Sequence, residues 1–245
     1  MRLFLASPSS HQYLIEEFKK SLFILESYFY FKEWEISLIY SSKDFLLDSG
    51  AFTFLNSQKS KSPDFDKYLE RYISFINKYD IKHFFELDID KIVGYKKVLE
   101  YREKLEYETG KKCIPVWHRS RGKDEYYKIC EDYDYIAVGG LAIKEIKKNE
   151  YKFLNALCKI AKERDCKVHG LGFTPSNTEN YKFYSCDSTS WVSGGRFARV
   201  HKLDCDRIKS QSFKNKRLIN YKELNRLNLN EWVKYQKYLY NKGHD

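Results

Sequence analysis

Short strand-like runs alternate with longer helix-like stretches along most of this chain of 245 residues. The strand-like runs are short and rich in residues that favour β-strands. Between them lie segments whose apolar residues recur every three or four positions, as in amphipathic helices. The predicted strands are RLFLA (2–6), DFLLD (44–48), HFFELD (83–88), CIPVWH (113–118), YIAVGG (135–140), KVHGLG (167–172), FYSCD (183–187) and RFARVH (196–201).

Eight strands with helical connections predict an α/β fold, a (β/α)8 TIM barrel, with an open doubly wound sheet as the alternative. One unit late in the barrel is expected to be irregular, because STSWVSGG (188–195) is too short for a full helix. We expect a single domain over 1–245, with a basic helical C-terminal segment from about residue 205. The predicted helical connections include 12–29, 65–79, 92–110 and 150–165.

Polar residues and glycines stand at the carboxyl ends of the predicted strands, where (β/α)8 barrels place their catalytic groups. Polar side chains at these positions are hard to explain by packing, since a buried polar group without a partner costs free energy. The sequence therefore predicts a polar pocket at one mouth of the barrel. Its candidate residues are Asp48, Asp88, His118, Gly139, Gly140, His169 and Asp187.

The aspartates of this set admit two interpretations. Asp48 alone could form a turn, and Asp187 alone could cap a following helix. Together, from different strands of one barrel, they could face one substrate, with one as nucleophile and the other as general acid or base. Asp88 could accept two N–H donors from a guanine-like edge, or it could cap the next helix.

The histidines and cysteines do not form a recognised metal motif. His118 and His169 could hold a metal with Asp187, but the H-x-H pair usual in barrel metallohydrolases is absent. A lone histidine at a strand end more often makes hydrogen bonds. We therefore predict no metal site and no cofactor. The six cysteines form no C-x-C or C-x-x-C pair, and we expect small buried hydrophobic residues in a reducing compartment.

A formal charge of +10 and a pI near 9.1 favour a polyanionic partner, because clustered Lys and Arg replace the counterions of a phosphate backbone. Two basic clusters follow predicted strands and could contact phosphate or form a solvated surface. No segment approaches the length of a membrane span, and the first apolar run is too short for a signal peptide, so we expect a cytoplasmic protein. The clusters are Arg119, Arg121 and Lys123, and Arg196 and Arg199.

Five motifs at the predicted strand ends resemble the tRNA-guanine transglycosylase superfamily, whose members are (β/α)8 barrels that exchange guanine for a 7-deazaguanine base. The resemblance covers about residues 45–199. Two features differ from the tRNA enzymes: their cysteine-rich zinc motif is absent, and His118 stands where they carry glutamine. In both respects the chain is more similar to the DpdA-type 7-deazaguanine DNA transglycosylases of phages and bacteria. The motifs are LLDSGAF (46–52), ELD (86–88), VGGLA (138–142), HGLGFTP (169–175) and CDSTSW (186–191).

The resemblance implies a role for each site residue. Asp187 would attack C1′ of the target nucleotide, displace guanine and form a covalent glycosyl ester, and Asp48 would manage the proton of the leaving and incoming bases. Arg119 or Arg196 would clamp phosphate while the target nucleotide is flipped out of the duplex. The residues expected to read or surround the base are Asp88, His118, Gly139, Gly140, Leu141 and His169.

The sequence thus predicts an enzyme, a pentosyltransferase that exchanges guanine in DNA for a 7-deazaguanine base such as preQ0. Its expected partners are DNA and that base. A tRNA substrate is the first alternative. A metal-dependent barrel hydrolase and a non-catalytic nucleic-acid-binding barrel are two further alternatives, the second favoured by the basic charge and the aromatic content of 17%.

Overall fold

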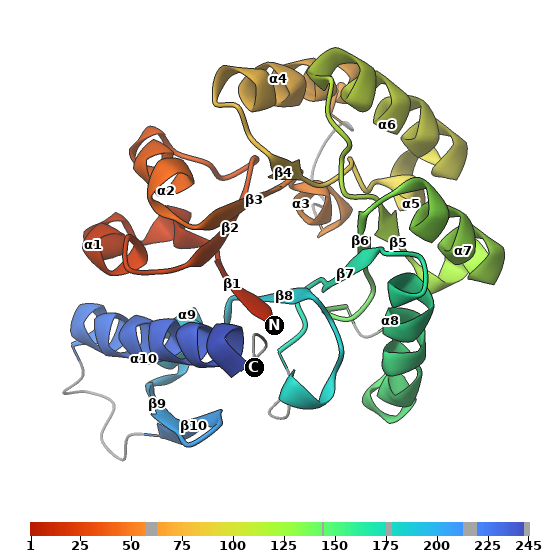
Figure 1. Cartoon of the computed structure of the whole chain (residues 1–245). Helices are drawn as coiled ribbons and strands as arrows, with labels where there is room; N and C mark the ends of the chain where they lie inside the picture. The colour runs from red at the N-terminus through yellow and green to blue at the C-terminus, as the bar shows by residue number, and fades with distance from the viewer. Residues whose placement is uncertain (57–62, 144, 175–177, 213–219, 243–245) are drawn as a thin grey trace.

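The structure is a computed structural model that describes residues 1–56, 63–143, 145–174, 178–212 and 220–242. Eight parallel strands form one curled sheet in the order β4-β3-β2-β1-β8-β7-β6-β5. An isolated parallel bridge between Phe85 and Ile114 joins its two edges, so the strands run in sequence order around a ring. This confirms the predicted (β/α)8 TIM barrel (Figure 1). The strands are β1 Arg2–Ala6, β2 Phe23–Ser27, β3 Asp44–Asp48, β4 His83–Phe84, β5 Val116–Trp117, β6 Tyr135–Val138, β7 Lys167–Gly170 and β8 Ser185–Ser188.

Side chains from alternate strand positions fill the inside of the barrel. The intervening residues, such as Leu3, Leu5 and Ile24, are fully buried in a larger cluster between the strands and the helices. Because both faces of the sheet are buried, the strands are apolar throughout, which explains their continuous apolar runs in the sequence. The inner cluster consists of Phe4, Ala6, Phe23, Leu25, Leu46, Phe85, Ile114, Val116, Tyr135 and Ala137.

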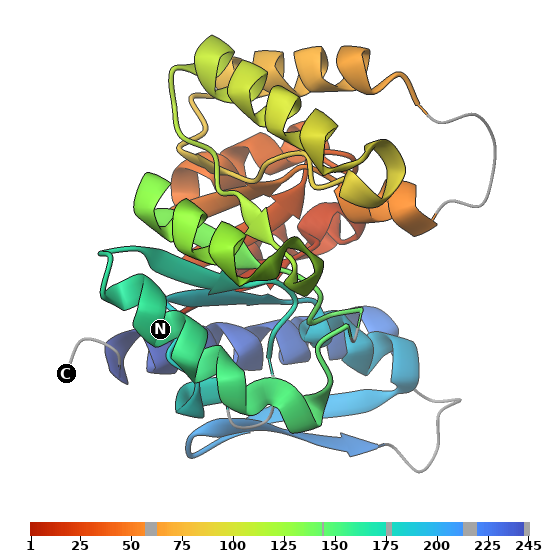
Figure 2. The ribbon, with the colours of Figure 1, turned by 90° about the vertical axis from the view of Figure 1, so that its right-hand side faces the viewer.

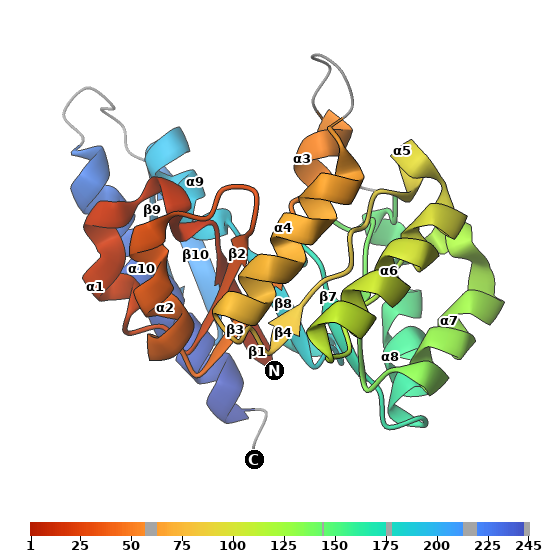
Figure 3. The same ribbon diagram turned by 90° about the horizontal axis from the view of Figure 1, so that it is seen from above.

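Helices surround the barrel (Figures 1 and 3). Helix α4 begins where Asp64 accepts the N–H of Lys67 at 3.1 Å, and its buried residues Tyr68, Leu69 and Tyr72 recur at helical spacing. Within the described ranges, no helix combines the length and the apolar character needed to cross a membrane. The helices are α1 Ile15–Phe18, α2 Ile36–Ser41, α3 Ala51–Asn56, α4 Phe65–Lys78, α5 Asp90–Val93, α6 Tyr95–Thr109, α7 Gly122–Asp132, α8 Leu154–Lys162, α9 Ser190–Phe197 and α10 Tyr221–Lys242.

Strand β2 corrects one prediction. The sequence predicts a helix over 12–29, but this stretch contains short helical turns followed by β2, Phe23–Ser27. Four of the five residues of β2 are buried, and the strand pairs in parallel with β1 and β3. A run of consecutive apolar residues fits a buried strand as well as a helix, and here the contacts with the neighbouring strands decide the outcome.

The eighth predicted strand, 196–201, lies outside the barrel. Residues Arg199–Asp204 form β9, which pairs antiparallel with β10, Arg207–Ser212. This hairpin packs beside α10, where the N–H of His201 donates to Asn228 at 2.7 Å (Figure 2). The run predicted as the seventh strand supplies β8 instead. The basic segment expected to be helical from about 205 therefore begins with a strand, and its helix starts at Tyr221.

The irregular unit lies between β7 and β8. In its described residues, 171–174 and 178–184, one 3-10 turn, Thr178–Asn180, is the sole helical element. The barrel thus has an irregular unit late in its order, but the prediction that 188–195 forms it is wrong, because that stretch follows the last barrel strand and enters the eight-residue helix α9. The stretch 188–195 ends β8, enters α9 and leads out of the barrel to the β9–β10 hairpin.

Helix α10 packs against the start of the barrel wall (Figure 1). The Gln236 side chain accepts the N–H of Leu22 at 2.6 Å and donates to the carbonyls of Leu3 and Phe23, both at 2.7 Å. The α-amino group of Met1 donates to a carbonyl near the end of the same helix at 3.0 Å. The last helix thus fastens the first two strands of the barrel.

The cysteines follow their prediction with one exception. Five of the six are buried as small apolar residues. Cys205 is exposed, because it lies in the turn between β9 and β10 rather than in the barrel.

Candidate active site

A cavity of about 390 Å³ opens at the carboxyl ends of the strands. All eight barrel strands, or the residues that directly follow them, contribute to its wall. Helices α3, α5 and α9 stand around the same end of the molecule, away from the two chain termini (Figure 3). The position is the one at which (β/α)8 enzymes carry out their chemistry. The predicted residues that line the cavity are Asp48, Asp88, His118, Gly139, Gly140 and Asp187.

Asp48 ends β3 and lines the cavity. Its Oδ2 accepts the N–H of Gly50 at 2.9 Å, so the side chain forms the turn suggested by its sequence and also faces the cavity. Burial is the main reason that the pKa of Asp48 is raised to about 6, and the negative charges of Asp187 and Asp88 act in the same direction. A carboxyl group with this pKa can take up and release a proton near neutral pH.

Asp187 lies in β8 and is 8% exposed. Its Oδ1 accepts the N–H of Gly172 at 2.6 Å and lies 3.2 Å from Nε2 of His169. Asp187 does not have its alternative role as a helix cap: the N-cap of α9 is Thr189, and Oγ of Ser188 accepts the N–H of Ser190, the first residue of the helix, at 3.1 Å. Asp187 is therefore held at the cavity by β7 and the residues after it, and it does not cap the helix.

Asp88 is the centre of an ionic network at the end of β4. Its Oδ2 lies 2.7 Å from Nε2 of His118, and its Oδ1 accepts a hydrogen bond from Arg121 at 2.8 Å. Burial raises the pKa of Asp88, and the hydrogen bond and charge of His118 limit that rise. Because each carboxylate oxygen has two lone pairs, both oxygens keep capacity for a further donor.

His118 faces Asp88 from the end of β5. Burial lowers the pKa of His118, but the hydrogen bond to Asp88 and the negative charge of Asp88 outweigh it, so the pKa is raised. Glu145 Oε2 lies 3.5 Å from Nδ1 on the other side of the ring. A Cβ at position 139 would come within 2.6 Å of the His118 ring, so Gly139 is required for the packing of this histidine. The N–H of Gly139 is used by the sheet, where it donates to Trp117.

Two predicted pocket residues lie behind the cavity wall. Leu141 is 4% exposed and packs in the core between strands and helices, and His169 is fully buried. Neither lines the cavity directly. His169 reaches the site through Asp187, whereas Leu141 has an apolar environment that packing explains.

Arg121 is not placed to contact phosphate. Only 3% of its side chain is exposed, and it pairs with Glu86 at 2.9 Å, with Asp88 at 2.8 Å and with Asp90 at 3.2 Å. An arginine that is enclosed by three carboxylates supports their charges and has no face left for DNA. The other four predicted phosphate contacts are exposed at the surface: Arg119, Lys123, Arg196 and Arg199.

Several hydroxyl groups at the cavity were missed in the sequence. Ser27 lines it from β2, the strand that the sequence assigned to a helix. Thr174 also lines it, and its hydroxyl donates to Ser188 at 2.7 Å. Ser and Thr occur throughout the chain with no distinguishing spacing, so only a correct strand assignment could have identified them. Over the part of the chain that the structure describes, no group of three or more His, Cys, Asp and Glu residues is arranged to hold a metal ion.

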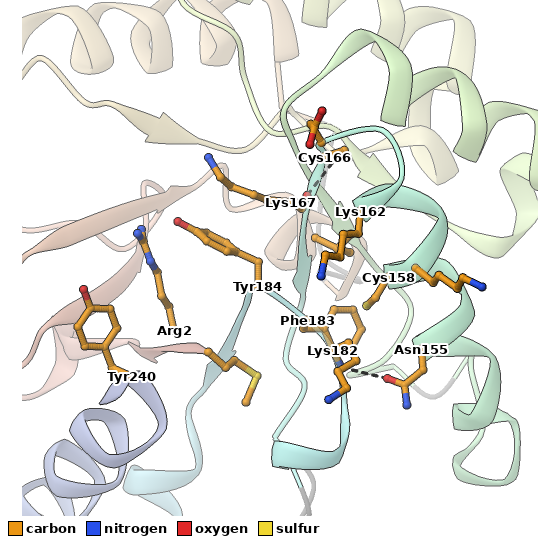
Figure 4. A pocket seen from close by; sticks show the side chains of 14 residues that line it. Arg2, Asn155, Cys158, Lys162, Cys166, Lys167, Lys182, Phe183, Tyr184 and Tyr240 are labelled. Atoms are coloured by element: carbon orange, nitrogen blue, oxygen red, sulfur yellow. Dashed lines mark hydrogen bonds between the residues drawn. The ribbon is translucent and has the colours of Figure 1, made fainter. Parts of the chain in front are cut away.

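A larger cavity of about 840 Å³ lies at the opposite end of the barrel (Figure 4). Its wall includes the first residues of β1 and β7, so it opens at the amino ends of the strands. There Nη1 of Arg2 forms an ion pair with Oδ2 of Asp44 at 2.8 Å, and the Arg2 guanidinium stacks on Tyr184 with its Cζ 4.6 Å from the ring centroid. This end of a barrel serves stability in (β/α)8 enzymes, so size alone does not make this cavity the catalytic site. Its lysines are Lys159, Lys162, Lys167 and Lys182.

Comparison with known proteins identifies the fold and no family. No family model matches the chain, and no curated protein matches it. A solved structure of a protein from Aquifex aeolicus VF5 is similar over 97% of this chain and 93% of its own, with a TM-score of 0.59 and 12% sequence identity. At that identity, the similarity shows the fold alone.

Two named enzymes show weaker structural similarity. A GH113 β-1,4-mannanase is 14% identical with a TM-score of 0.41, over 71% of this chain and 72% of its own. The carboxyl transferase domain of Rhizobium etli pyruvate carboxylase, solved with 3-bromopyruvate, is 13% identical with a TM-score of 0.49, over 98% of this chain and 47% of that chain. None of these three structures is named as a transglycosylase. The chain's own strand order shows the (β/α)8 barrel, and any inference about its function depends on the residues of its own cavity.

Proposed function

We propose that this protein is a transglycosylase that exchanges guanine in DNA for a 7-deazaguanine base such as preQ0. One observation carries the proposal: three aspartates from different strands, Asp48, Asp88 and Asp187, line one cavity together with His118. The cavity has the size of a small-molecule site, for which about 300–1,000 Å³ is usual. The resemblance of the surrounding motifs to the 7-deazaguanine DNA transglycosylases supplies the reaction.

The first step forms a covalent intermediate on Asp187. One carboxylate oxygen attacks C1′ of the target nucleotide while the bond between C1′ and N9 of guanine breaks. The electron pair of that bond leaves with the base, which takes a proton from Asp48. The raised pKa of Asp48, about 6, supports this role, because the protonated form is then available close to neutral pH.

The second step reverses the first with another base. The incoming 7-deazaguanine gives its N9 proton to the Asp48 carboxylate, N9 attacks C1′, and the ester bond to Asp187 breaks. Asp187 and Asp48 return to their starting states, so no cofactor is consumed. Closure of the cavity over the bound nucleotide would protect the ester from water between the two steps.

Asp88 and His118 are suited to recognise the base. Asp88 is fixed by His118 and Arg121, yet each of its oxygens has a lone pair left for an N–H group of a guanine-like edge. A charge-assisted hydrogen bond of this kind discriminates strongly in a site that excludes water. Guanine and 7-deazaguanines share that edge, which explains how one pocket can accept both the leaving and the incoming base.

The nucleic acid would approach the exposed basic residues at the same end of the barrel. Arg119 follows β5, and Arg196 ends α9, which follows β8. Both strands end at the cavity, so phosphates bound by these side chains would flank a nucleotide flipped into it. We place the reaction in the cytoplasm, where DNA and tRNA are both available as substrates.

The test is a base-exchange assay with purified protein, guanine-containing DNA and radiolabelled preQ0. We expect label in DNA with the wild-type protein and none with Asp187→Asn, which keeps the size of the side chain but removes the nucleophile. Asp80→Asn is the matched control, because Asp80 lies outside the cavity lining and pairs with Lys111 at the surface.

The outcomes separate the alternatives. Equal labelling by wild type and Asp187→Asn contradicts the nucleophile assignment. Label that enters tRNA and not DNA identifies the sister reaction. Tight, salt-dependent DNA binding without label in either nucleic acid identifies a non-catalytic binding barrel.

A further inference from the structure

A chain of buried side chains runs through the barrel beneath Asp187. Tyr135 Oη lies 2.6 Å from Oγ of Ser185, and Ser185 Oγ lies 2.7 Å from Nδ1 of His169. Nε2 of the same imidazole lies 3.2 Å from Oδ1 of Asp187. His169 and Ser185 are fully buried, and Tyr135 is 6% exposed. Four polar side chains are thus connected end to end inside an otherwise apolar barrel.

This row of hydrogen-bonded side chains crosses three neighbouring strands, which lie side by side in Figure 1. Tyr135 begins β6, His169 lies in β7 opposite Ser185, and Ser185 and Asp187 lie in β8. The rings of Phe4 and Phe85 pack against His169 with centroids 5.9 and 5.4 Å away. Polar groups in such surroundings must form hydrogen bonds with one another, and each of these four side chains has a hydrogen-bond partner within the row.

The chemistry of the four groups gives the hydrogen bonds one direction. Ionised Asp187 only accepts, so Nε2 of His169 carries the proton. In a neutral imidazole Nδ1 then accepts, so the Ser185 hydroxyl donates to it. The Ser185 oxygen in turn accepts from Tyr135. Burial raises the pKa of Tyr135, which keeps the phenol protonated as the donor that begins the chain.

Both donors to Asp187 contact the same oxygen. Oδ1 receives the N–H of Gly172 at 2.6 Å as well as the His169 ring. Gly172 has a φ of 63°, a conformation that favours glycine, and it turns this N–H toward the carboxylate. Among the described residues, no hydrogen-bond donor contacts Oδ2. The two oxygens of Asp187 are therefore unequal before any substrate binds.

We propose that Tyr135, Ser185 and His169 form a positioning column that fixes the Asp187 carboxylate and leaves Oδ2 as the oxygen that attacks C1′. The inference rests on the proposed function for the identity of the electrophile, but the column itself is a property of the free protein. His169 acts through Asp187 and touches no reacting atom, so it is a positioning residue. Pre-orientation of this kind lowers the reorganisation needed in the transition state.

The first test reads the column without any substrate. Long-range ¹H–¹⁵N NMR of the protein at pH 7 reports which nitrogen of His169 carries the proton, and His169→Gln assigns the signal among the six histidines. We expect a neutral ring protonated at Nε2. Ser185→Ala should shift the Nδ1 resonance, and Tyr135→Phe should shift it less. A ring protonated at Nδ1, or at both nitrogens, overturns the proposal.

The second test measures single-turnover guanine release from DNA. His169→Leu should lower the rate roughly 10–100-fold, as loss of an orienting partner does at other sites, with KM for DNA unchanged. His169→Gln should recover part of the rate, because its amide can still donate to Oδ1. Tyr184→Phe is the control, since it removes a neighbouring phenol that lies outside the column.

The two tests fail independently. If the wild-type protein releases no guanine, the proposed function is wrong, while the NMR result still judges the column. If the wild type releases guanine and His169→Leu does so at the same rate, the column is wrong and the function stands. Equal losses in the single-turnover rate from His169→Leu and from Tyr184→Phe also overturn the column, because they show a general disturbance of the barrel.

Discussion

Nε2 of His118 and Oδ2 of Asp88 are 2.7 Å apart at the ends of β5 and β4, two strands that are consecutive in the barrel. Arg121 holds the other Asp88 oxygen at 2.8 Å. A carboxylate held on both sides has a fixed orientation before a ligand arrives, so its selectivity is set by geometry rather than by adjustment. In the proposed function, His118 and Arg121 would therefore influence the recognition of a base through Asp88.

Replacement of His118 tests this arrangement. The pKa of His118 is raised in the folded protein, so its contribution to stability is fully present below its unfolded value of 6.5 and is lost as pH rises through the folded pKa. His118→Gln keeps a donor but cannot become charged. We expect it to lower the free energy of unfolding by about 1–2 kcal/mol at pH 6 and by less at pH 8. Urea unfolding at several pH values measures this, and a pH-independent difference contradicts it.

Asp48→Asn should make the protein more stable and less active. The pKa of Asp48 is raised to about 6 from 3.8, so the folded state loses stability relative to the unfolded state as the pH rises from 3.8 to 6, and the full penalty is present above pH 6. The free energy of unfolding of the variant should exceed that of the wild type by up to about 3 kcal/mol at pH 8, since each unit of pKa shift corresponds to about 1.4 kcal/mol. The gain should shrink as the pH falls below 6 and disappear well below 3.8, where the carboxyl is protonated in both states. Urea unfolding measures the gain, and no gain at pH 8 would show that Asp48 is well solvated.

Arg121→Met should destabilise the protein strongly. The change removes the cation that Glu86, Asp88 and Asp90 share. Glu86 keeps its pair with Arg102 and Asp88 keeps its pair with His118, so the cost should lie near the lower end of the about 3–5 kcal/mol that is typical when a buried ion pair loses one partner. Arg119→Met is the matched control two positions away, where the loss of an exposed ion pair with Glu150 should have little effect on stability. Thermal and urea unfolding compare the two, and similar losses would contradict the assignment of Arg121 to structural support.

Arg196→Ala should weaken DNA binding without changing its sequence dependence. One lost phosphate contact should lower the slope of log affinity against log salt by about 1. Lys162→Ala is the control, because Lys162 lies at the other end of the barrel in the larger cavity of Figure 4. Fluorescence anisotropy at several salt concentrations measures both slopes. A reduced slope for Lys162→Ala alone would place the DNA at the amino ends of the strands.

The sequence predicted the barrel and the gathering of its polar residues because both depend on local signals. A strand that is buried on both faces is recognisable as an apolar run, and Asp48, Asp88, His118 and Asp187 each follow or end such a run. Since parallel strands of one barrel end at the same mouth, their proximity in space follows from the fold class. The catalytic roles remain predictions.

The remaining differences arise from contacts that the sequence does not specify. The sequence pattern of β2 is also compatible with a helix, and its pairing with β1 and β3 makes it a strand. Residues 196–201 have the composition of a strand but pair with β10 outside the barrel. In the sequence Arg121 cannot be distinguished from a surface cation such as Arg119. In the structure it is buried because it pairs with three carboxylates. In each case, partners distant in sequence decide the environment of the residue.

The hydrogen bond from the Gln236 side chain to the carbonyl of Leu3 joins residues that are 233 positions apart in the sequence. A nascent polypeptide cannot form this hydrogen bond until α10 has left the ribosome. The surface of β1 that α10 covers therefore stays exposed while the other strands are synthesised. Contacts of such long range slow the final step of folding and prolong the exposure of apolar surface. We expect the barrel to reach its native state only after α10 has emerged from the ribosome, with α10 as the last element to dock.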